Sequence, residues 1–146
     1  MCTGNICRSP MAEGIFNNMV KEMGKEKLYL SISAGIFACE GQSASSEAVE
    51  VVKDMGVDIS RHISQGISEK LLEESDLVIT MTNAHKDAIG SRFFKYKDRV
   101  FTIYEYANNE CKDVNDPYGR SIDVYNKCAK EIYDLVLLML KREDFK

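Results

Sequence analysis

The sequence lacks the features that mark membrane proteins, disordered chains and nucleic-acid-binding proteins. Its longest wholly apolar run is LVLLML at positions 135–140, far below the roughly 20 residues that a membrane span needs, and the chain opens without a charged-then-apolar leader. It contains two prolines and no low-complexity stretch, which excludes a disordered composition. The net charge is -4, and lysines and arginines form no cluster. We therefore expect no nucleic-acid and no membrane partner.

Metal ligands are also scarce. The two histidines, His62 and His85, are not in a paired ligand spacing, and a zinc site at Cys2 and Cys7 needs more ligands than these two thiols. We therefore expect no metal and no cofactor. The five cysteines, at positions 2, 7, 39, 111 and 128, are an odd number at irregular spacings, which suits a reducing compartment better than a secreted disulfide framework. These features predict a cytoplasmic protein.

What is present is typical of a globular chain with a single domain over residues 1–146. Of its 146 residues, 45% are apolar and 29% are charged. Helical spacing of apolar residues predicts helices at 10–24, 45–56, 68–76, 83–93 and from 121 into the C-terminal segment. Alternation and short apolar runs predict strands at 28–35, 77–82 and 99–106. This order predicts an α/β fold, a three-layer sandwich whose small central parallel sheet is flanked by helices.

One strand is missing from this order. In a doubly wound fold, a phosphate-binding loop follows the carboxyl end of a strand and leads into a helix. Here the loop begins at Cys2, and Met1 alone cannot form a strand. We therefore expect a domain that lacks its N-terminal strand, either because the chain starts late or because the sheet does without it. Low stability and weak activity are expected unless a short apolar β-segment fills the centre of the sheet.

The opening stretch CTGNICRS has the composition of an anion-binding loop. Gly4 permits close approach of the backbone, and Asn5 tolerates the left-handed region. The loop runs into a helix start, which offers backbone N–H groups and a positive dipole end, and Arg8 adds a planar bidentate fork for phosphate oxygens. The same positive field favours the nucleophilic thiolate form of Cys2, to which Ser9 is placed to donate a hydrogen bond.

The spacing alone leaves other interpretations open. A cysteine followed six residues later by an arginine also arises by chance, and a free cysteine is more often a small buried hydrophobe than a nucleophile. Alternatively, removal of Met1 makes Cys2 an N-terminal nucleophile that uses its own α-amino group as base, as an amidase would. That interpretation leaves Arg8 and the Gly-Asn loop without a role.

Cleavage of a phosphate ester also needs an acid to protonate the leaving group. Asp116 is a candidate because Pro117 follows it and restricts both residues to an extended turn, with an aromatic residue next. A plain Asp-Pro turn before the last helix is the alternative.

The motifs CTGNICRSPMAE and DPYG together closely resemble the low-molecular-weight protein tyrosine phosphatases. The stretches SAG, SRHIS, ESDLVITMT and IDVY fall in family order between and after them. The resemblance implies that Cys2 is the nucleophile of a phosphocysteine intermediate, that Arg8 binds phosphate and stabilises the transition state, and that Asp116 is the acid and then the base. No metal is implied, because the loop and Arg8 supply the positive charge.

The resemblance also assigns supporting roles. It implies a phosphate-binding loop made of Thr3, Gly4, Asn5, Ile6, Cys7 and Ser9. Asn5, Ser9, Ser33 and His62 match positions that hold this loop in its strained shape. Cys7 matches a cysteine that captures the oxidised nucleophile as a disulfide. Phe37 is expected at the mouth of the site, opposite Tyr118.

The family contains tyrosine phosphatases and a bacterial branch that acts on phosphoarginine. The arginine branch has threonine before the second loop cysteine, whereas this chain has Ile6. An isoleucine side chain packs well against a phenyl ring but has no polar group to bond a guanidinium. The stretches SAGIFA, KDRVFTIYEY and GRSIDVY instead resemble the arginine branch. Because the resemblance places Ile6 against the substrate, we expect a protein tyrosine phosphatase, with a protein-arginine phosphatase as the alternative.

Two further alternatives share the same loop type. One is an inactive phosphate-binding or redox module, since a loop without its strand can fail to hold its donors in place. The other is an arsenate reductase, which Asp116-Pro117 and the aromatic after it disfavour. The expected partner is a phosphorylated protein substrate, and the sequence does not indicate an oligomeric state.

Overall fold

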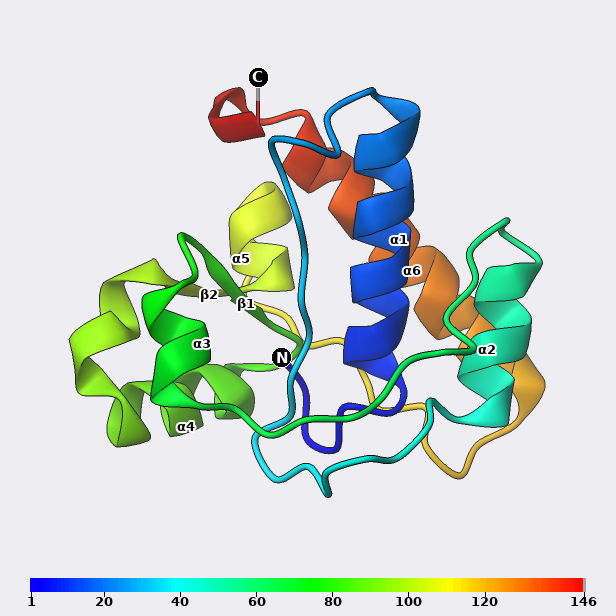
Figure 1. Ribbon diagram of the computed structural model, residues 1–146, viewed down its shortest axis with the longest axis horizontal. Coiled ribbons are helices and arrows are strands. Elements are labelled where there is room, and N and C mark those ends of the chain that lie inside the picture. Colours follow the sequence, from blue (N-terminus) through cyan, green and yellow to red (C-terminus); the bar gives the residue numbers. More distant parts are fainter. Residues whose placement is uncertain (146) are drawn as a thin grey trace.

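The computed structural model describes residues 1–145, in which helices cover both faces of a small parallel sheet (Figure 1). The two strands pair in parallel with Val78 opposite Val100 and Thr80 opposite Thr102. In chain order the elements are α1 (Arg8–Glu22), α2 (Ser46–Lys53), α3 (Glu69–Glu73), β1 (Val78–Thr80), α4 (Asn83–Arg92), η1 (Phe94–Arg99), β2 (Val100–Thr102), α5 (Ile103–Asn108), α6 (Ile122–Leu140) and η2 (Glu143–Phe145).

The sheet separates two apolar clusters. One face of the strands packs into a small cluster under α3, α4 and η1, formed by Ile36, Leu72, Val78, Ile89, Tyr96 and Val100. On the other face, partly buried Ile79 packs against the main core, to which α1, α2 and α6 contribute most of the buried side chains. Burial of apolar area on both faces is what holds a parallel sheet between helices. The predicted three-layer α/β arrangement is confirmed.

The helices begin where the sequence places hydroxyl side chains. Ser45, Ser68, Thr82 and Ser121 each accept a hydrogen bond from a backbone N–H in the first turn of the helix that follows, which satisfies donors left free at a helix start. Within the described residues, no helix combines the length and apolarity needed to cross a bilayer.

The predicted strand at 99–106 is wrong in its second half. The strand β2 ends at Thr102 and α5 starts at Ile103. Thr102 and Glu105 form a reciprocal capping box, in which each side chain accepts the backbone N–H of the other residue. Two further backbone donors are thereby satisfied at the helix start, so the capping box overrides the β-propensity of the tyrosines that follow.

The predicted strand at 28–35 is extended but forms no ladder with a neighbouring strand. Within residues 1–145, its bridges are isolated ones at Gly35, to Cys2 and to Gly66. The segment is held on one side by α1, where Asn17 bonds both backbone groups of Ser31. On its other side, residues 28–33 pair with no strand of residues 1–145, and the apolar side chains of Leu30 and Ile32 are 74% and 58% exposed.

Met1 and Cys2 lie between this extended segment and β1, as the end of a central strand would. On one side, the Met1 ammonium donates to Ile79 O at 2.7 Å, and Met81 N–H donates to Met1 O at 3.0 Å. On the other side, Cys2 N–H donates to Ala34 O at 3.4 Å, and Ile36 N–H donates to Cys2 O at 2.9 Å. This pattern is that of a parallel strand bonded to both neighbours.

Candidate active site

The loop from Cys2 to Cys7 leads directly into α1, and the start of that helix faces the loop without a cap. No side chain of the described residues accepts from the first N–H groups of α1, and its first turn contains no acidic residue. The first-turn donors of a 15-residue helix, together with its positive dipole end, are therefore free for an anion. Arg8 lies in this same turn.

Asn5 organises the loop. It has a φ of 58°, in the left-handed region that asparagine tolerates better than most residues. Its side-chain amide donates to Ser9 Oγ and to Ser33 Oγ, both at 2.9 Å, and its Oδ1 accepts the Gln65 N–H at 3.0 Å. Its backbone oxygen lies 2.7 Å from His62 Nε2. The left-handed turn is thus fixed by bonds to several other segments of the chain.

The thiol of Cys2 is held at the centre of this network. Its Sγ lies 2.8 Å from Ser9 Oγ, which also accepts from Asn5, so the Ser9 hydroxyl is oriented to donate to Cys2. Cys2 is only 3% exposed. The backbone of the next residue lies close to Gly35, since a Cβ added at Gly35 would be 2.5 Å from Thr3 O. Only glycine permits this close approach of the two segments.

Arg8 connects the loop to the segment that carries Asp116. Its Nη1 donates to Val114 O at 2.9 Å, and its Nη2 lies 3.4 Å from Asp116 Oδ2. The Arg8 side chain is 5% exposed and that of Asp116 is 52% exposed, so the cation is fixed while the carboxylate reaches solvent. A fixed buried guanidinium beside free helix N–H groups provides a strong anion site.

Cys7, the last residue of the loop, is buried in the main core beside two hydroxyl groups. Its Sγ is 3.4 Å from Ser45 Oγ and 3.2 Å from Tyr125 OH. Burial raises the pKa of the Cys7 thiol above its ordinary value, with the two hydroxyls acting in the opposite direction. Cys7 is therefore a protonated thiol near neutral pH, unlike an activated nucleophile.

The residues expected at the mouth lie in loops with exposed rings. Phe37 is 75% exposed and Tyr118 is 65% exposed, although large aromatic side chains are usually buried. Ile6 is half-buried and packs against the main core. An exposed aromatic on each of two loops fits a surface that covers part of a substrate.

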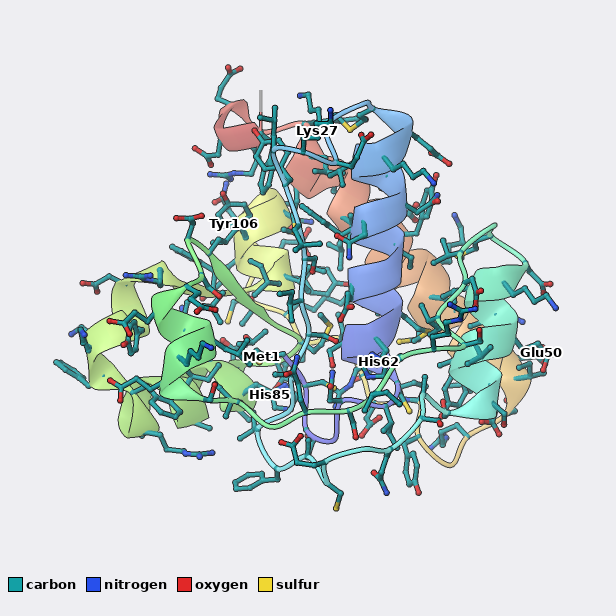
Figure 2. The ribbon with its side chains drawn as sticks, viewed as in Figure 1. Met1, Lys27, Glu50, His62, His85 and Tyr106 are labelled. Atoms are coloured by element: carbon teal, nitrogen blue, oxygen red, sulfur yellow. The ribbon has the colours of Figure 1, made fainter. Side chains whose placement is uncertain are left out.

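Three supporting contacts were not predicted from the sequence. Glu13 of α1 accepts from both the backbone N–H and the hydroxyl of Ser33, Gln65 bonds Asn5, and His85 Nε2 lies 2.9 Å from Thr3 Oγ1. Figure 2 shows His62 and His85 on opposite sides of the opening loop. These partners are far apart in sequence, and no motif or period links them.

Burial lowers the pKa of His85 to about 4, and the nearby positive charges of Arg8 and the N-terminal ammonium act in the same direction. His85 is therefore neutral near pH 7, and its Nδ1 is buried without a hydrogen-bond partner in the described residues. Among residues 1–145, no group of three or more histidine, cysteine, aspartate or glutamate side chains is arranged to hold a metal ion.

Comparison with known proteins identifies close relatives. The family model described as low molecular weight phosphotyrosine protein phosphatase matches residues 1–143. The chain is 40% identical over 143 residues to the protein-arginine-phosphatase of Bacillus subtilis, which covers 97% of this chain and 93% of that protein.

Solved structures agree over almost the whole chain. A low molecular weight protein tyrosine phosphatase from T. tengcongensis is 48% identical with a TM-score of 0.91, covering 96% of this chain and 94% of its own. A cysteine-to-serine mutant of the YwlE arginine phosphatase, with a phosphorylated active-site serine, is 38% identical with a TM-score of 0.91, covering 99% of this chain and 96% of its own. The family expected from the opening loop and the DPYG motif is thus confirmed, and the chain belongs to the low molecular weight phosphotyrosine protein phosphatases.

Proposed function

We propose that this phosphatase hydrolyses phosphotyrosine in proteins, with Cys2 as nucleophile, Arg8 as phosphate ligand and Asp116 as acid and base. The observation that carries the proposal is the Cys2 thiol, 2.8 Å from Ser9 Oγ at the uncapped start of α1. Arg8 and Asp116 lie together beside that start, 3.4 Å apart. Cys2 and Arg8 are thus both linked to the start of α1, and Asp116 is held beside Arg8, which supports a covalent phosphoryl transfer at this place.

In the first step, the Cys2 thiolate attacks phosphorus and the bond to the tyrosine oxygen breaks. The leaving phenolate takes a proton from Asp116, and an S–P bond forms at Cys2. Arg8 and the N–H groups of the loop and helix start stabilise the charge on the three equatorial oxygens. The phosphorylated active-site serine in the YwlE mutant supports a phosphoenzyme of this kind, because serine there stands in place of a cysteine.

In the second step, water attacks the same phosphorus from the side that the phenol has left. The Asp116 carboxylate accepts a proton from this water, the S–P bond breaks, and inorganic phosphate leaves with the Cys2 thiolate restored. The Ser9 hydroxyl stabilises the departing thiolate by the hydrogen bond that it makes with Cys2.

The other residues of the loop serve this chemistry through their backbone. We assign phosphate contacts to the N–H groups of the loop, which comprises Thr3, Gly4, Asn5, Ile6, Cys7 and Ser9. Ser33 and His62 support the loop through their hydrogen bonds to Asn5. Because these contacts hold the N–H donors in place before substrate binds, the donors need little reorientation when charge develops on the phosphate oxygens.

We infer phosphotyrosine rather than phosphoarginine from the residues that we expect to line the site. The Ile6 side chain is apolar, and Phe37 and Tyr118 supply exposed aromatic rings, which suit a phenyl ring better than a charged guanidinium. Among the solved structures, the low molecular weight protein tyrosine phosphatase from T. tengcongensis is 48% identical and the YwlE arginine phosphatase mutant is 38% identical.

A protein-arginine phosphatase is the second candidate, because two of the compared relatives carry that name. The two functions separate on matched peptides that differ only in phosphotyrosine or phosphoarginine. We expect the wild type to prefer the tyrosine peptide and Ile6→Thr to shift the ratio toward the arginine peptide. A wild type that prefers phosphoarginine would overturn the tyrosine assignment.

Catalysis itself is tested with p-nitrophenyl phosphate. We expect Cys2→Ser to lower turnover by at least about a thousandfold, because a serine hydroxyl at neutral pH is a far weaker nucleophile than a thiolate. Equal rates for Cys2→Ser and wild type would mean that the catalytic role given to Cys2 is wrong. We also infer a cytoplasmic location, because all five cysteines are free thiols and suit a reducing compartment.

A further inference from the structure

The start of α4 holds the segment that carries Asp116. Asp113 Oδ1 accepts two hydrogen bonds from Asn83, one from its backbone N–H at 2.8 Å and one from its side-chain amide at 3.0 Å. Asn83 is the first residue of α4, a 10-residue helix. A carboxylate at this position bonds a free helix donor and lies at the positive end of the dipole.

The next residue after Asp113 is fixed as well. Val114 is fully buried, its N–H donates to Met81 O at 2.9 Å, and its oxygen accepts from Arg8. Asp113 and Val114 therefore form the anchored end of the segment, two to three residues before Asp116.

Asp116 itself has weaker restraints. Its Oδ1 accepts the Tyr118 N–H at 3.1 Å within its own turn, and its Oδ2 lies 3.4 Å from Arg8. A substrate phosphate competes with Asp116 for the Arg8 guanidinium. Once phosphate has taken that fork, the acid segment is still tied to helices by Arg8 Nη1 at Val114 O, by Cys128 Sγ at Asn115 O and by Asn83 at Asp113. In the described part of the chain, Asp113 is the one residue of 113–115 whose own side chain makes such a hydrogen bond.

The same helical turn also contacts the nucleophile loop. His85, two residues after Asn83, has its Nε2 2.9 Å from Thr3 Oγ1, and Thr3 follows Cys2. The first turn of α4 is thus bonded to both halves of the site. A site whose two halves are bonded to the same helix keeps its geometry better than one whose halves move independently.

We propose that Asp113, through Asn83, is a positioning residue that sets the place of Asp116 relative to the leaving group. The inference rests on the proposed function, in which Asp116 protonates the phenolate. Loss of the anchor leaves the Cys2 nucleophile and the Arg8 site intact and weakens only the proton transfer. Poor leaving groups then suffer most, because an acidic phenol leaves without a proton.

The test compares kcat/KM on phenyl phosphate and on p-nitrophenyl phosphate, whose phenol is more acidic. For Asp113→Ala we expect a loss of about tenfold on phenyl phosphate and less than about threefold on p-nitrophenyl phosphate, a smaller loss than removal of an acid causes. Asp113→Asn keeps an acceptor oxygen for the Asn83 N–H and is expected to retain most of the activity. Equal losses on both substrates, or no loss, would overturn the inference.

Two further variants make the test specific. Asp87→Ala is the matched control, since Asp87 is an exposed carboxylate of α4 with no hydrogen-bond or ion-pair partner in residues 1–145, and it is expected to match wild type. Asp116→Asn gives the full loss of the acid, and adding Asp113→Ala to it is expected to lower kcat/KM no further. Additive losses in the double variant would show that Asp113 acts independently of Asp116 and would overturn the inference.

Failure of the proposed function is distinguishable in the same data. If Asp116→Asn lowers kcat/KM equally on both substrates, Asp116 is not the acid, and the inference falls with that assignment. If Asp116→Asn shows the leaving-group dependence and Asp113→Ala does not, the function stands and only the role of Asp113 is wrong. Melting temperatures of all variants, measured by circular dichroism, check that each is folded.

Discussion

The guanidinium of Arg8 lies 3.4 Å from the carboxylate of Asp116, so the phosphate ligand and the acid of the proposed mechanism are direct neighbours. The Arg8 side chain is buried, whereas Asp116 is half exposed. We therefore expect the cation to keep its place and the carboxylate to move when an anion enters. Under the proposed mechanism, binding of phosphate and release of Asp116 toward the leaving group are parts of one exchange at Arg8.

Replacing Arg8 with lysine tests this exchange. We expect Arg8→Lys to lower kcat/KM on p-nitrophenyl phosphate by about a hundredfold or more, because an ammonium cannot reproduce the planar fork that binds two phosphate oxygens. Inorganic phosphate is expected to inhibit the variant more weakly. The measurement is steady-state kinetics with a phosphate inhibition series.

The control for that variant is Arg120→Lys. Arg120 is exposed and lies four residues after Asp116, so the change keeps the charge near the site without touching the fork. It is expected to match wild type. Wild-type kinetics and phosphate inhibition in Arg8→Lys would contradict the role given to Arg8.

Cys7→Ser tests the protective role expected for the second cysteine of the loop. Peroxide oxidises the Cys2 thiolate to a sulfenic acid, and the Cys7 thiol then displaces water to form a disulfide that added thiol reduces. We expect wild type to recover most of its activity after peroxide and then dithiothreitol. Cys7→Ser is expected to recover less, because the sulfenic acid proceeds to irreversible forms. Activity before and after rescue is measured.

Cys39→Ser is the matched control, since Cys39 is an exposed thiol outside the loop. It is expected to recover as wild type does. Equal recovery of Cys7→Ser and wild type would remove the protective role from Cys7. In that case the contacts of Cys7 with Ser45 and Tyr125 are purely structural.

The sequence was sufficient for the parts of the site that lie within one short segment. Asn5 was expected in the left-handed region, and its φ is 58°. Glu13, Gln65 and Asp113 were missed, because each acts on a residue that the fold brings close from a distant part of the chain. A charged residue in a helix or turn looks like a solvated surface residue until its partner is known.

Helices were predictable where the spacing of apolar residues and a capping hydroxyl residue both marked the same helix. The α6 helix followed from its apolar spacing after Ser121. The strand at 99–106 was extended too far because β-rich tyrosines hid the capping box of Thr102 and Glu105. The segment at 28–35 has the pattern of a strand, but a strand needs a neighbour, and local sequence does not report whether one is present.

A stability test follows from the buried histidine. Burial lowers the pKa of His85 from 6.5 to about 4, with Arg8 acting in the same direction and Asp113 and Asp116 opposing it. Between pH 6.5 and pH 4, His85 is therefore protonated in the unfolded chain and neutral in the folded chain. This contribution to stability is complete above pH 6.5 and is lost as the pH falls through that window.

We expect His85 to account for a fall of about 2 kcal/mol in the free energy of unfolding between pH 7 and pH 5. His85→Gln keeps a polar partner for Thr3 but cannot bind the proton, so its pH dependence is expected to be shallower by that amount. Urea titrations of both proteins at the two pH values measure it. Parallel pH dependence of wild type and His85→Gln would contradict the assignment.

The last prediction concerns the space between the extended segment at 28–33 and β1. Leu30 and Ile32 of this segment have exposed side chains, and their backbone groups have no hydrogen-bond partner within the described residues. Met1 and Cys2 already make the bonds of a central parallel strand. A designed extension of about five alternating valines and isoleucines before Met1 continues that strand and pairs with both neighbours.

We expect this extension to raise the melting temperature by about 10 °C, because two or three newly buried branched side chains contribute several kcal/mol. Turnover of p-nitrophenyl phosphate is expected to rise with it, since a strand that continues into Cys2 fixes the backbone position of the nucleophile. A Gly-Ser extension of the same length is the control, because it removes the ammonium from Met1 without supplying apolar side chains. If both extensions have the same melting temperature and turnover, the added residues do not pair as a strand. The hydrogen bonds of Asn5 then suffice to hold the loop, and the prediction is wrong.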